Sequence, residues 1–441
     1  MQRGGLLLLV WVMGIACDRQ RGAPRQEEPK KVGLPPVLSL RAPSSTSVPS
    51  PKAVCTRDTW PDYGHDGRRT STSRECIEEP LRLLWKAQAT TPVKERPASF
   101  DHVVATEEGL YATGLRGKSS MLHGLNLDGT PRWDHDTRTD LHFAFWPLVA
   151  HGVVGMNDDG TFFLDPTSGH IKINLGLDSW GQMTADTNQF YWVNTWHVHG
   201  PALYVGAFSP SGEALWKQNK YGGAVPMDMM DDLGGVALDG NIVFQAANYK
   251  FASFSGVFAF EAATGKLRWS KNGSPVGLPS AADGRVFVVE RVQRERRVVA
   301  RSQHDGELLW STPLRGAQGA APALASGLTL VATEQGALVA LDASSGQERW
   351  RFETGHKQTP VIGHETSIAI AANDRVVFST GKELILLTLS TGQERWRGEV
   401  AGAQVHSPIL AGGRVYAVAG GEILAFEGAP LRGEESSRVT P

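Results

Sequence analysis

The sequence predicts an all-β fold, an eight-bladed β-propeller of four-stranded blades, from three observations. A short motif ending in Trp recurs along the chain, and successive copies end 40 to 53 residues apart. Each interval holds short apolar segments separated by Gly or Asp turns, and a period of about 40 to 50 residues is what one four-stranded blade requires. Gly (49 residues) and Trp (13 residues) are both abundant, which suits many short strands joined by turns.

The motif is clearest at residues 340–350, 388–396 and 259–269, and the first of these reads Ala-Leu-Asp-Ala-Ser-Ser-Gly-Gln-Glu-Arg-Trp. We expect each terminal Trp to lie in the outermost strand of its blade and to pack against the neighbouring blade, as a structural docking residue. Eight final strands are predicted, and they end at Trp85, Trp133, Ile173, Trp216, Trp269, Trp310, Trp350 and Trp396.

The last complete unit illustrates how a blade is built and how the ring closes. Residues 359–362, 375–378 and 383–387 are expected to form its first three strands, and the strand ending at Trp396 completes it. Three further strands follow without a fourth, whereas residues 81–88 form a final strand that lacks the three before it. We therefore expect residues 81–88 to complete the last blade, which removes exposed sheet edges.

The N-terminus resembles a bacterial lipoprotein signal. Arg3 precedes an apolar run from Leu6 to Ala16, which is too short to cross a bilayer. Gly14-Ile15-Ala16-Cys17 is similar to a lipoprotein cleavage box, although Gly14 stands where Leu is usual. The resemblance implies a lipid anchor at Cys17 as the chain's only membrane contact, and plain secretion or an uncleaved anchor are the alternatives.

The predicted organisation has five parts. Residues 17–54 are rich in Pro, Ser and charged residues and hold few apolar groups, so we expect a disordered tether. Export to an oxidising compartment predicts a disulfide between Cys55 and Cys76. The parts are a signal peptide (1–16), the lipid-anchored tether (17–54), a disulfide-closed lead-in (55–80), the propeller (81–428) and a disordered tail (429–441).

The pattern Ala-x-Asp-x-x-Thr-Gly-x-x-x-Trp resembles the quinoprotein-type repeat of pyrroloquinoline quinone (PQQ) dehydrogenases and of their non-enzymatic PQQ-like relatives. Residues 60–70 also resemble the lead-in that precedes many such propellers, so the resemblance covers roughly residues 60–428. The repeat is specific for fold but not for function, because one architecture hosts unrelated tasks.

The resemblance does not extend to the catalytic apparatus. The dehydrogenases carry an adjacent Cys-Cys pair beside the cofactor, together with calcium ligands and a catalytic Asp. The cysteines of this chain are Cys17, Cys55 and Cys76, of which no two are adjacent, and the metal ligands cannot be carried over to matching positions. We therefore predict no catalytic, cofactor-binding or metal-binding residues, PQQ included, and keep a quinone- or metal-dependent oxidoreductase as the second alternative.

A second resemblance is to the propeller lipoprotein of the bacterial outer-membrane barrel-assembly machinery, which shares the lipid anchor, the eight blades and the repeat type. That protein lacks the long Pro/Ser tether and the disulfide-closed lead-in. We predict a monomeric, non-catalytic scaffold that binds an envelope protein or glycan at the periplasmic or outer-membrane face. An outer-membrane protein assembly factor is the alternative.

Charge and aromatic content bear on possible partners. The formal net charge is −2, from 44 Lys and Arg against 46 Asp and Glu, so the chain offers no global positive field for nucleic acid. Arginines between Arg291 and Arg301 are interpreted as the border of a solvated hairpin, with contact to an anionic surface as the alternative. Aromatic residues near Ile173 are expected to fill the space of the missing Trp. Any surplus, with Trp192 and Trp196 as candidates, would form a partner or glycan surface.

Overall fold

In the computed structural model the chain divides into two units, Met1–Pro51 and Lys52–Pro441, and all of the described residues belong to the second. The described residues are 54–89, 98–117, 119–137, 146–157, 161–175, 182–194, 204–219, 235–248, 255–355, 368–400 and 403–430. Cys17, the signal peptide, nearly all of the tether, Trp196 and residues 431–441 lie outside them. Within the described part of the chain, no helix is long and apolar enough to cross a membrane.

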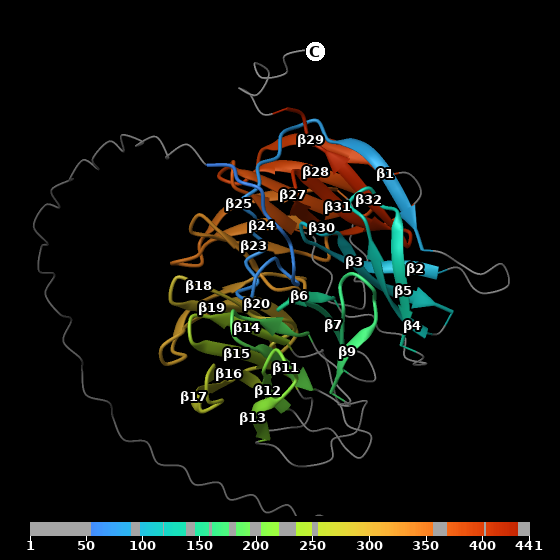
Figure 1. Cartoon of the computed structure of the whole chain (residues 1–441). Helices are drawn as coiled ribbons and strands as arrows, with labels where there is room; N and C mark the ends of the chain where they lie inside the picture. Colours follow the sequence, from blue (N-terminus) through green and yellow to red (C-terminus); the bar gives the residue numbers. More distant parts are fainter. Residues whose placement is uncertain are drawn as a thin grey trace, which may run out of the picture. The chain divides into compact units, whose positions relative to one another are not determined.

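Eight four-stranded antiparallel sheets form a propeller (Figure 1), which confirms the predicted fold class. Blades 1 to 4 consist of β2 (Ala98–Ala105), β3 (Leu110–Arg116), β4 (Ser119–Leu125) and β5 (Pro131–Asp136); β6 (Leu148–Ala150), β7 (Val153–Asn157), β8 (Thr161–Leu164) and β9 (Ile171–Asn174); β10 (Thr184–Ala185), β11 (Phe190–Asn194), β12 (Tyr204–Phe208) and β13 (Ala214–Asn219); β14 (Gly235–Asp239), β15 (Ile242–Ala247), β16 (Gly256–Glu261) and β17 (Leu267–Asn272).

Blades 5 to 8 follow the same order, each starting from the inner strand. They consist of β18 (Ser280–Ala282), β19 (Arg285–Val292), β20 (Glu295–Ser302) and β21 (Leu308–Pro313); β22 (Ala323–Ala325), β23 (Leu328–Ala332), β24 (Ala337–Asp342) and β25 (Glu348–Glu353); β26 (Ile368–Ala371), β27 (Arg375–Thr380), β28 (Glu383–Thr388) and β29 (Glu394–Glu399); β30 (Val405–Ala411), β31 (Arg414–Ala419), β32 (Glu422–Glu427) and β1 (Arg82–Gln88).

The ring closes through β1, which is the outermost strand of blade 8. It pairs antiparallel with β32 from Arg82 opposite Glu427 to Gln88 opposite Glu422, in the order β1-β32-β31-β30. In Figure 1 the blue β1 lies beside the red C-terminal strands. The predicted closure by residues 81–88 is confirmed, and it joins the two ends of the propeller without a free sheet edge between them.

One predicted strand of blade 7 is misplaced. The innermost strand is β26, whose Ile368 pairs with Phe378 and whose Ala371 pairs with Arg375, and not residues 359–362, which lie outside the described residues. Both segments are short and apolar, so hydropathy alone did not separate them. The tight turn from Ala371 to Arg375 favours β26, because it sets the register of the hairpin.

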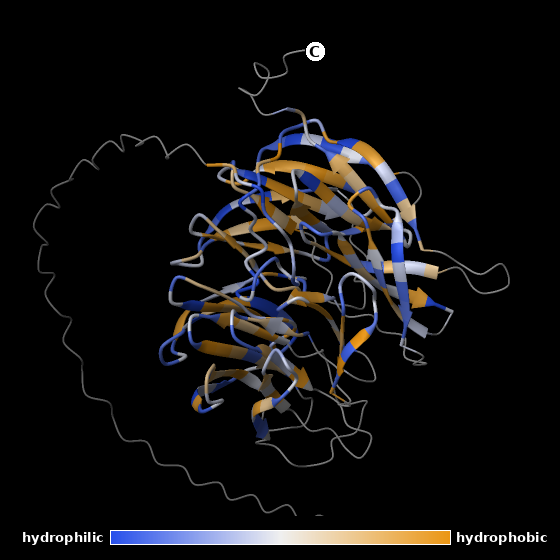
Figure 2. Cartoon of the chain, viewed as in Figure 1, coloured by the Kyte–Doolittle hydropathy of each residue, from blue (hydrophilic) through white to orange (hydrophobic). Residues whose placement is uncertain are grey.

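Burial explains the hydropathy pattern of the strands. The third strand of blade 6, β24, is buried at five consecutive positions because a blade packs against each of its faces. The outermost strand, β25, alternates, with Trp350 buried between exposed charged residues. In Figure 2 hydrophobic residues accordingly colour the strands inside the blades, while hydrophilic residues colour many of the turns.

The recurring Trp and Gly of the motif form one contact between neighbouring blades. Trp310 of blade 5 donates its indole N–H to the Ala343 carbonyl of blade 6 at 3.0 Å. A Cβ on Gly346, in the last turn of blade 6, would lie 2.5 Å from Trp310 Cε3. The same stacking joins Trp85 to Gly129, Trp133 to Gly169, Ile173 to Gly212, Trp216 to Gly265, Trp269 to Gly306 and Trp350 to Gly392.

Candidate functional site

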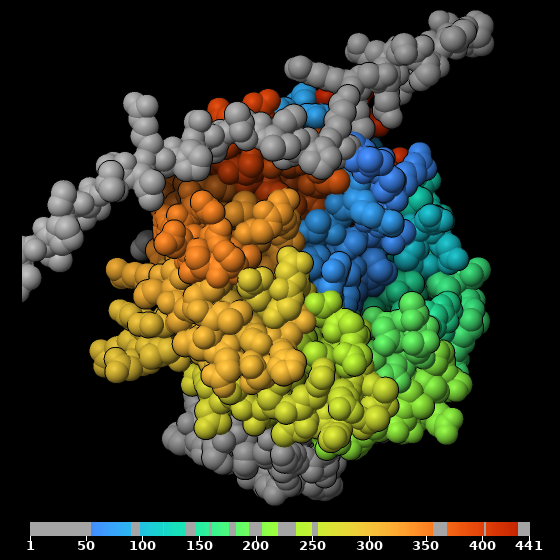
Figure 3. Space-filling view, turned by 90° about the vertical axis from the view of Figure 1, so that its left-hand side faces the viewer, coloured from blue at the N-terminus to red at the C-terminus, as the bar shows by residue number. Residues whose placement is uncertain are grey.

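The lead-in lies across the end of the propeller at which the inner strands finish, and it reaches all eight blades. In Figure 3 its blue atoms lie between the orange, yellow and green blades. From Trp60 to Ser71 the order of contacts along the lead-in follows the order of blades 1 to 7, and Asp58 reaches blade 8. The hydrogen bonds are Trp60 N–Ala105 O (2.7 Å), Val149 N–Pro61 O (2.8 Å), Thr184 Oγ1–Asp62 Oδ2 (2.6 Å), Leu238 N–Gly67 O (2.7 Å), Ala281 N–Arg68 O (2.9 Å), Leu324 N–Thr70 O (2.8 Å), Ile370 N–Ser71 O (2.8 Å) and Gly412 N–Asp58 O (3.1 Å).

Arg69 is the buried anchor of the lead-in. Its guanidinium is 0% exposed and donates to three carbonyl oxygens, those of Tyr63 (3.1 Å), Met183 (3.1 Å) and Val236. Asp62 supplies the counter-charge at 3.8 Å. Because every partner is a fixed acceptor, this one side chain ties the lead-in to blades 3 and 4.

Asp62 is the acidic partner in this buried pair. Its carboxylate accepts hydrogen bonds from Thr184 Oγ1 and from the Tyr63 backbone N–H, both at 2.6 Å. Burial raises the pKa of the Asp62 carboxyl to about 6, although Arg69 and these hydrogen bonds oppose the rise. The pair is therefore ionised at neutral pH only while its partners stay in place.

Asp58 organises the outer part of the lead-in. Its carboxylate accepts from His65 Nε2 (3.0 Å), from the Arg74 backbone N–H (2.8 Å) and guanidinium (3.0 Å), and from the Thr59 N–H (3.0 Å). Burial opposes the charge, but the hydrogen bonds from His65 and Arg74 hold the pKa of Asp58 well below its usual range. The carboxylate of Asp58 thereby connects the start of the lead-in to Arg74 near its end.

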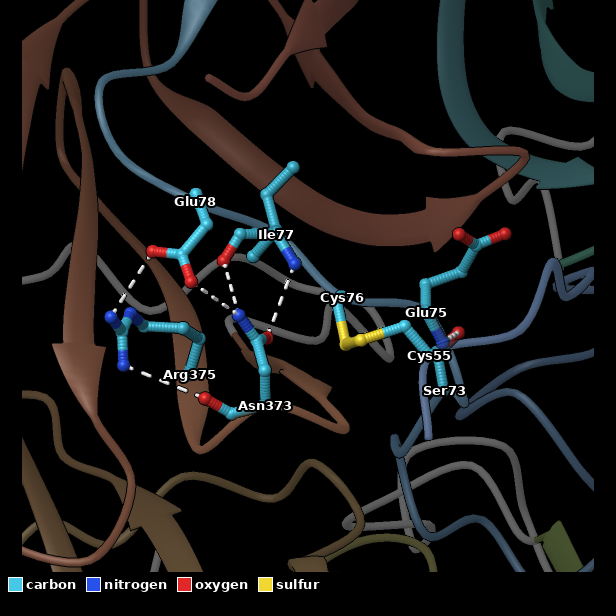
Figure 4. Close-up of a disulfide and its surroundings, with 8 residues drawn as sticks. All are labelled: Cys55, Ser73, Glu75, Cys76, Ile77, Glu78, Asn373 and Arg375. Atoms are coloured by element: carbon cyan, nitrogen blue, oxygen red, sulfur yellow. Dashed lines mark hydrogen bonds and ion pairs between the residues drawn. A yellow bond between two sulfur atoms is a disulfide. The ribbon is translucent and has the colours of Figure 1, made fainter. Parts of the chain in front are cut away.

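The predicted disulfide joins Cys55 to Cys76, with 5.3 Å between the two Cα atoms and a sequence separation of 21 (Figure 4). Directly after it, the Ile77 N–H donates to Asn373 Oδ1 (3.1 Å), and Asn373 Nδ2 donates back to the Ile77 carbonyl (2.9 Å). The disulfide therefore closes the lead-in where the chain is also bound to the first turn of blade 7.

The exit of the lead-in is bound to blade 7 by ion pairs. Arg375 contacts Glu78 at 3.2 Å and Glu79 at 3.1 Å, and Arg395 contacts Glu79 at 2.8 Å. Arg395 directly precedes Trp396, which is partly buried against the main core. In the other blades a turn joins the third strand to the fourth. In blade 8 the fourth strand is β1, so the lead-in exit, which runs into β1, stands where that turn would be.

Two clefts open beside the lead-in. The larger, of about 460 Å³, lies toward the inner turns of blades 5 and 6, and the second, of about 270 Å³, lies toward blades 2 and 3. Asp58, His65 and Asp66 line both. The larger cleft is lined by charged residues together with the apolar Phe287 and Leu324, a mixture that suits a ligand of mixed polarity.

Two ionisable groups lie on the inner strands of blades 1 and 8. Asp101 is at a bulge in β2, where the register shifts between Phe100 and His102, and burial raises its pKa to about 6. Burial lowers the pKa of His406, in β30, to about 4, so this imidazole is neutral at physiological pH. Among the described residues no group of three or more His, Cys, Asp or Glu side chains is arranged to hold a metal ion.

Replacing Asp101 by Asn is expected to stabilise the protein above about pH 6. A raised carboxyl pKa in the folded state means that stability is fully present below the unfolded pKa of about 4 and is lost as pH rises through about 6. The gain in unfolding free energy should reach about 2 to 3 kcal/mol at about pH 8 and vanish near pH 4. Urea unfolding of both proteins at several pH values measures it.

Asp128→Asn is the control for this experiment. Asp128 is exposed, and its hydrogen bonds with Thr130 lower its pKa, so its removal should give no stabilisation at about pH 8. An Asp101→Asn protein that is less stable than the parent at about pH 8 would contradict the proposed burial penalty.

The predicted aromatic partner surface is wrong at Trp192. Its ring is 1% exposed and packs with Phe208 at 5.5 Å between centroids, in a cluster that Ile173 and Leu175 border. Gly206, opposite Trp192 on β12, leaves room for the indole, because a Cβ there would lie 2.8 Å from Trp192 Nε1. Trp196, the second candidate, lies outside the described residues.

The sequence interpretation missed the central position of the lead-in. Residues 60–70 resemble a segment that precedes such propellers, but nothing in their pattern indicates eight separate contacts. The feature of the sequence that points to these contacts is the high density of turn-forming and hydrogen-bonding residues between Asp62 and Gly67.

Comparisons with known proteins agree with this architecture. The family model described as "Outer membrane protein assembly factor BamB" matches residues 202–292 and 254–432. The crystal structure of BamB from Moraxella catarrhalis is similar, with a TM-score of 0.56 and 13% identity, and the match covers 79% of this chain and 100% of that chain. No curated protein sequence gives a significant match.

Dehydrogenase structures are similar to the same degree. A europium-containing methanol dehydrogenase has a TM-score of 0.61 at 13% identity, covering 84% of this chain and 98% of that chain. The quinohemoprotein alcohol dehydrogenase from Comamonas testosteroni has a TM-score of 0.63 at 13% identity, covering 86% and 82%. At such identities the likeness shows a shared fold, which both enzymes and non-enzymes use.

Proposed function

Since the chain belongs to the family of PQQ-like propellers described as outer membrane protein assembly factor BamB, we propose that it is a non-catalytic scaffold of the bacterial cell envelope. In this proposal a signal peptide directs export, Cys17 carries a lipid, and the residues up to 54 tether the propeller to a membrane. The propeller binds an envelope protein or glycan through its loops. A role in the assembly of outer-membrane proteins is the narrower form of the same proposal.

The observation that carries the proposal is that the lead-in occupies the central end of the ring, where the inner strands of the blades finish. There the lead-in is hydrogen-bonded to the inner strands of blades 1 to 7 and to the turn after β30 in blade 8, and the Arg69–Asp62 pair is buried among them. These polar groups are hydrogen-bonded or ion-paired with other groups of the protein, and they stabilise the structure. The sequence also has no adjacent cysteines of the kind that the resemblance to quinone dehydrogenases would imply.

Affinity capture from detergent-solubilised envelopes tests the scaffold. The full-length chain, tagged at its C-terminus, should capture a defined envelope protein in a stoichiometric complex, while a heat-denatured chain should not. Recovery of the barrel-assembly subunits would support the narrower form. Failure to retain any envelope component would count against the scaffold.

A separate assay addresses catalysis. The purified chain is incubated with PQQ and either calcium or a lanthanide, and the reduction of an electron-accepting dye by primary alcohols is followed. The proposal expects no turnover above that of PQQ alone. Alcohol-dependent reduction that saturates with PQQ would overturn the non-catalytic assignment.

A further inference from the structure

The longest hairpin of blade 5 carries a basic cleft. β19 and β20 have 8 residues each, whereas the corresponding strands of blade 6, β23 and β24, have 5 and 6. At about 3.3 Å per residue, the blade 5 hairpin extends several ångströms beyond its neighbour. Its tip holds Val292, which is 44% exposed, and the step beside it is a cleft of about 710 Å³.

The cleft is at the opposite end of β19 from the lead-in. Arg285, at the start of β19, lines the larger cleft beside the lead-in, and Arg291, near its end, lines the basic cleft. The two surfaces are thus about 20 Å apart along one strand. A partner on the basic cleft would leave the lead-in uncovered.

Four arginines line the cleft against two glutamates. Arg296 already has partners within the protein, since it donates to Glu334 at 2.7 Å and to the Ala317 carbonyl at 2.6 Å. Arg294 and Arg315 are both exposed, and neither has an ion pair with another described residue. The remaining lining residues are Arg291, Glu295, Pro313, Gly316 and Gln335.

The wall that carries these groups is rigidly built from two blades. The Glu334 N–H donates to the Gly316 carbonyl (2.8 Å), and Ala317 bridges to Thr333. Gly316 has φ +67, a left-handed conformation that favours glycine. The backbone that holds Arg315 is therefore fixed relative to the hairpin of blade 5.

We infer that this cleft is the docking site for an acidic polypeptide segment of a partner protein. The inference rests on the proposed scaffold function and names the surface and the partner chemistry for it. Guanidinium groups form paired hydrogen bonds with carboxylates, and Arg is enriched at protein interfaces. A concave site with its own glutamates suits a defined peptide better than a uniformly anionic membrane.

Fluorescence anisotropy of the full chain with a labelled peptide of alternating Glu and Gly tests the inference. Arg294→Glu/Arg315→Glu is expected to weaken binding by about tenfold or more, and added salt should weaken the parent's binding. Lys266→Glu/Arg268→Glu is the matched control, because it makes the same charge change on exposed residues of blade 4. It should leave the affinity within about twofold of the parent.

Several outcomes would overturn the inference. They are equal binding by the parent and the cleft variant, an equal loss in the control, binding of the matched Gln-Gly peptide, or cleft-dependent binding of phosphatidylglycerol vesicles in place of the peptide. Envelope capture distinguishes a failure of the cleft inference from a failure of the scaffold proposal. A partner retained equally by the cleft variant rejects the cleft and leaves the scaffold proposal in place, whereas PQQ-dependent turnover rejects the scaffold proposal alone.

Discussion

Arg69→Met should lower the free energy of unfolding by about 3 to 5 kcal/mol at about pH 8, the cost of breaking a buried ion pair from one side. The substitution leaves Asp62 buried without its counter-charge, and it removes the donor from the Val236, Met183 and Tyr63 carbonyls. Because Arg69 lowers the pKa of Asp62, its loss raises that pKa further. The destabilisation should therefore shrink at about pH 5, where the carboxyl is protonated.

Arg68→Met is the matched control for this experiment, one residue away in the same segment. Its side chain is 51% exposed and pairs with Asp66 at the surface, so its loss should cost about 1 kcal/mol or less. Urea unfolding of the three proteins at both pH values gives the comparison. Equal losses for the two variants would mean that the lead-in is not anchored through Arg69.

Gly346→Ala is the second large effect, with an expected loss of about 2 to 5 kcal/mol. Gly346 has φ +72, which costs a residue with a Cβ about 1 to 2 kcal/mol. The added Cβ would also lie 2.5 Å from the Trp310 ring and 2.7 Å from Thr312 Oγ1. Displacing the packed indole adds about 1 to 3 kcal/mol.

Gly327→Ala separates these two causes. Gly327 lies in the same blade with φ +74, but no atom lies within 4 Å of its added Cβ. It should therefore show only the conformational cost. Thermal or urea unfolding, together with the fluorescence of the tryptophans, measures the difference, and identical losses for the two glycines would show that the interblade stack contributes little.

The sequence by itself determined the fold through patterns that repeat locally. Trp310 and Gly346 belong to consecutive copies of one motif, so their fixed spacing encoded the contact between blades that the structure places there. The count of final strands also determined the closure by β1. Such features could be predicted because each depends on turn chemistry and strand period within one unit of about 40 to 50 residues.

Only the tertiary structure decided what lies at the centre and on the surfaces of the propeller. Arg69 reads in the sequence as one more polar residue of a loop, yet it meets the Val236 carbonyl across 167 residues of chain. Trp192 reads as a surplus aromatic, yet it is buried against Phe208 and opposite Gly206. The basic cleft likewise is lined by Arg294 of blade 5 and by Glu334 of blade 6. Burial and electrostatic pairing at these positions depend on which segments the closed ring brings together, and no local period records that arrangement.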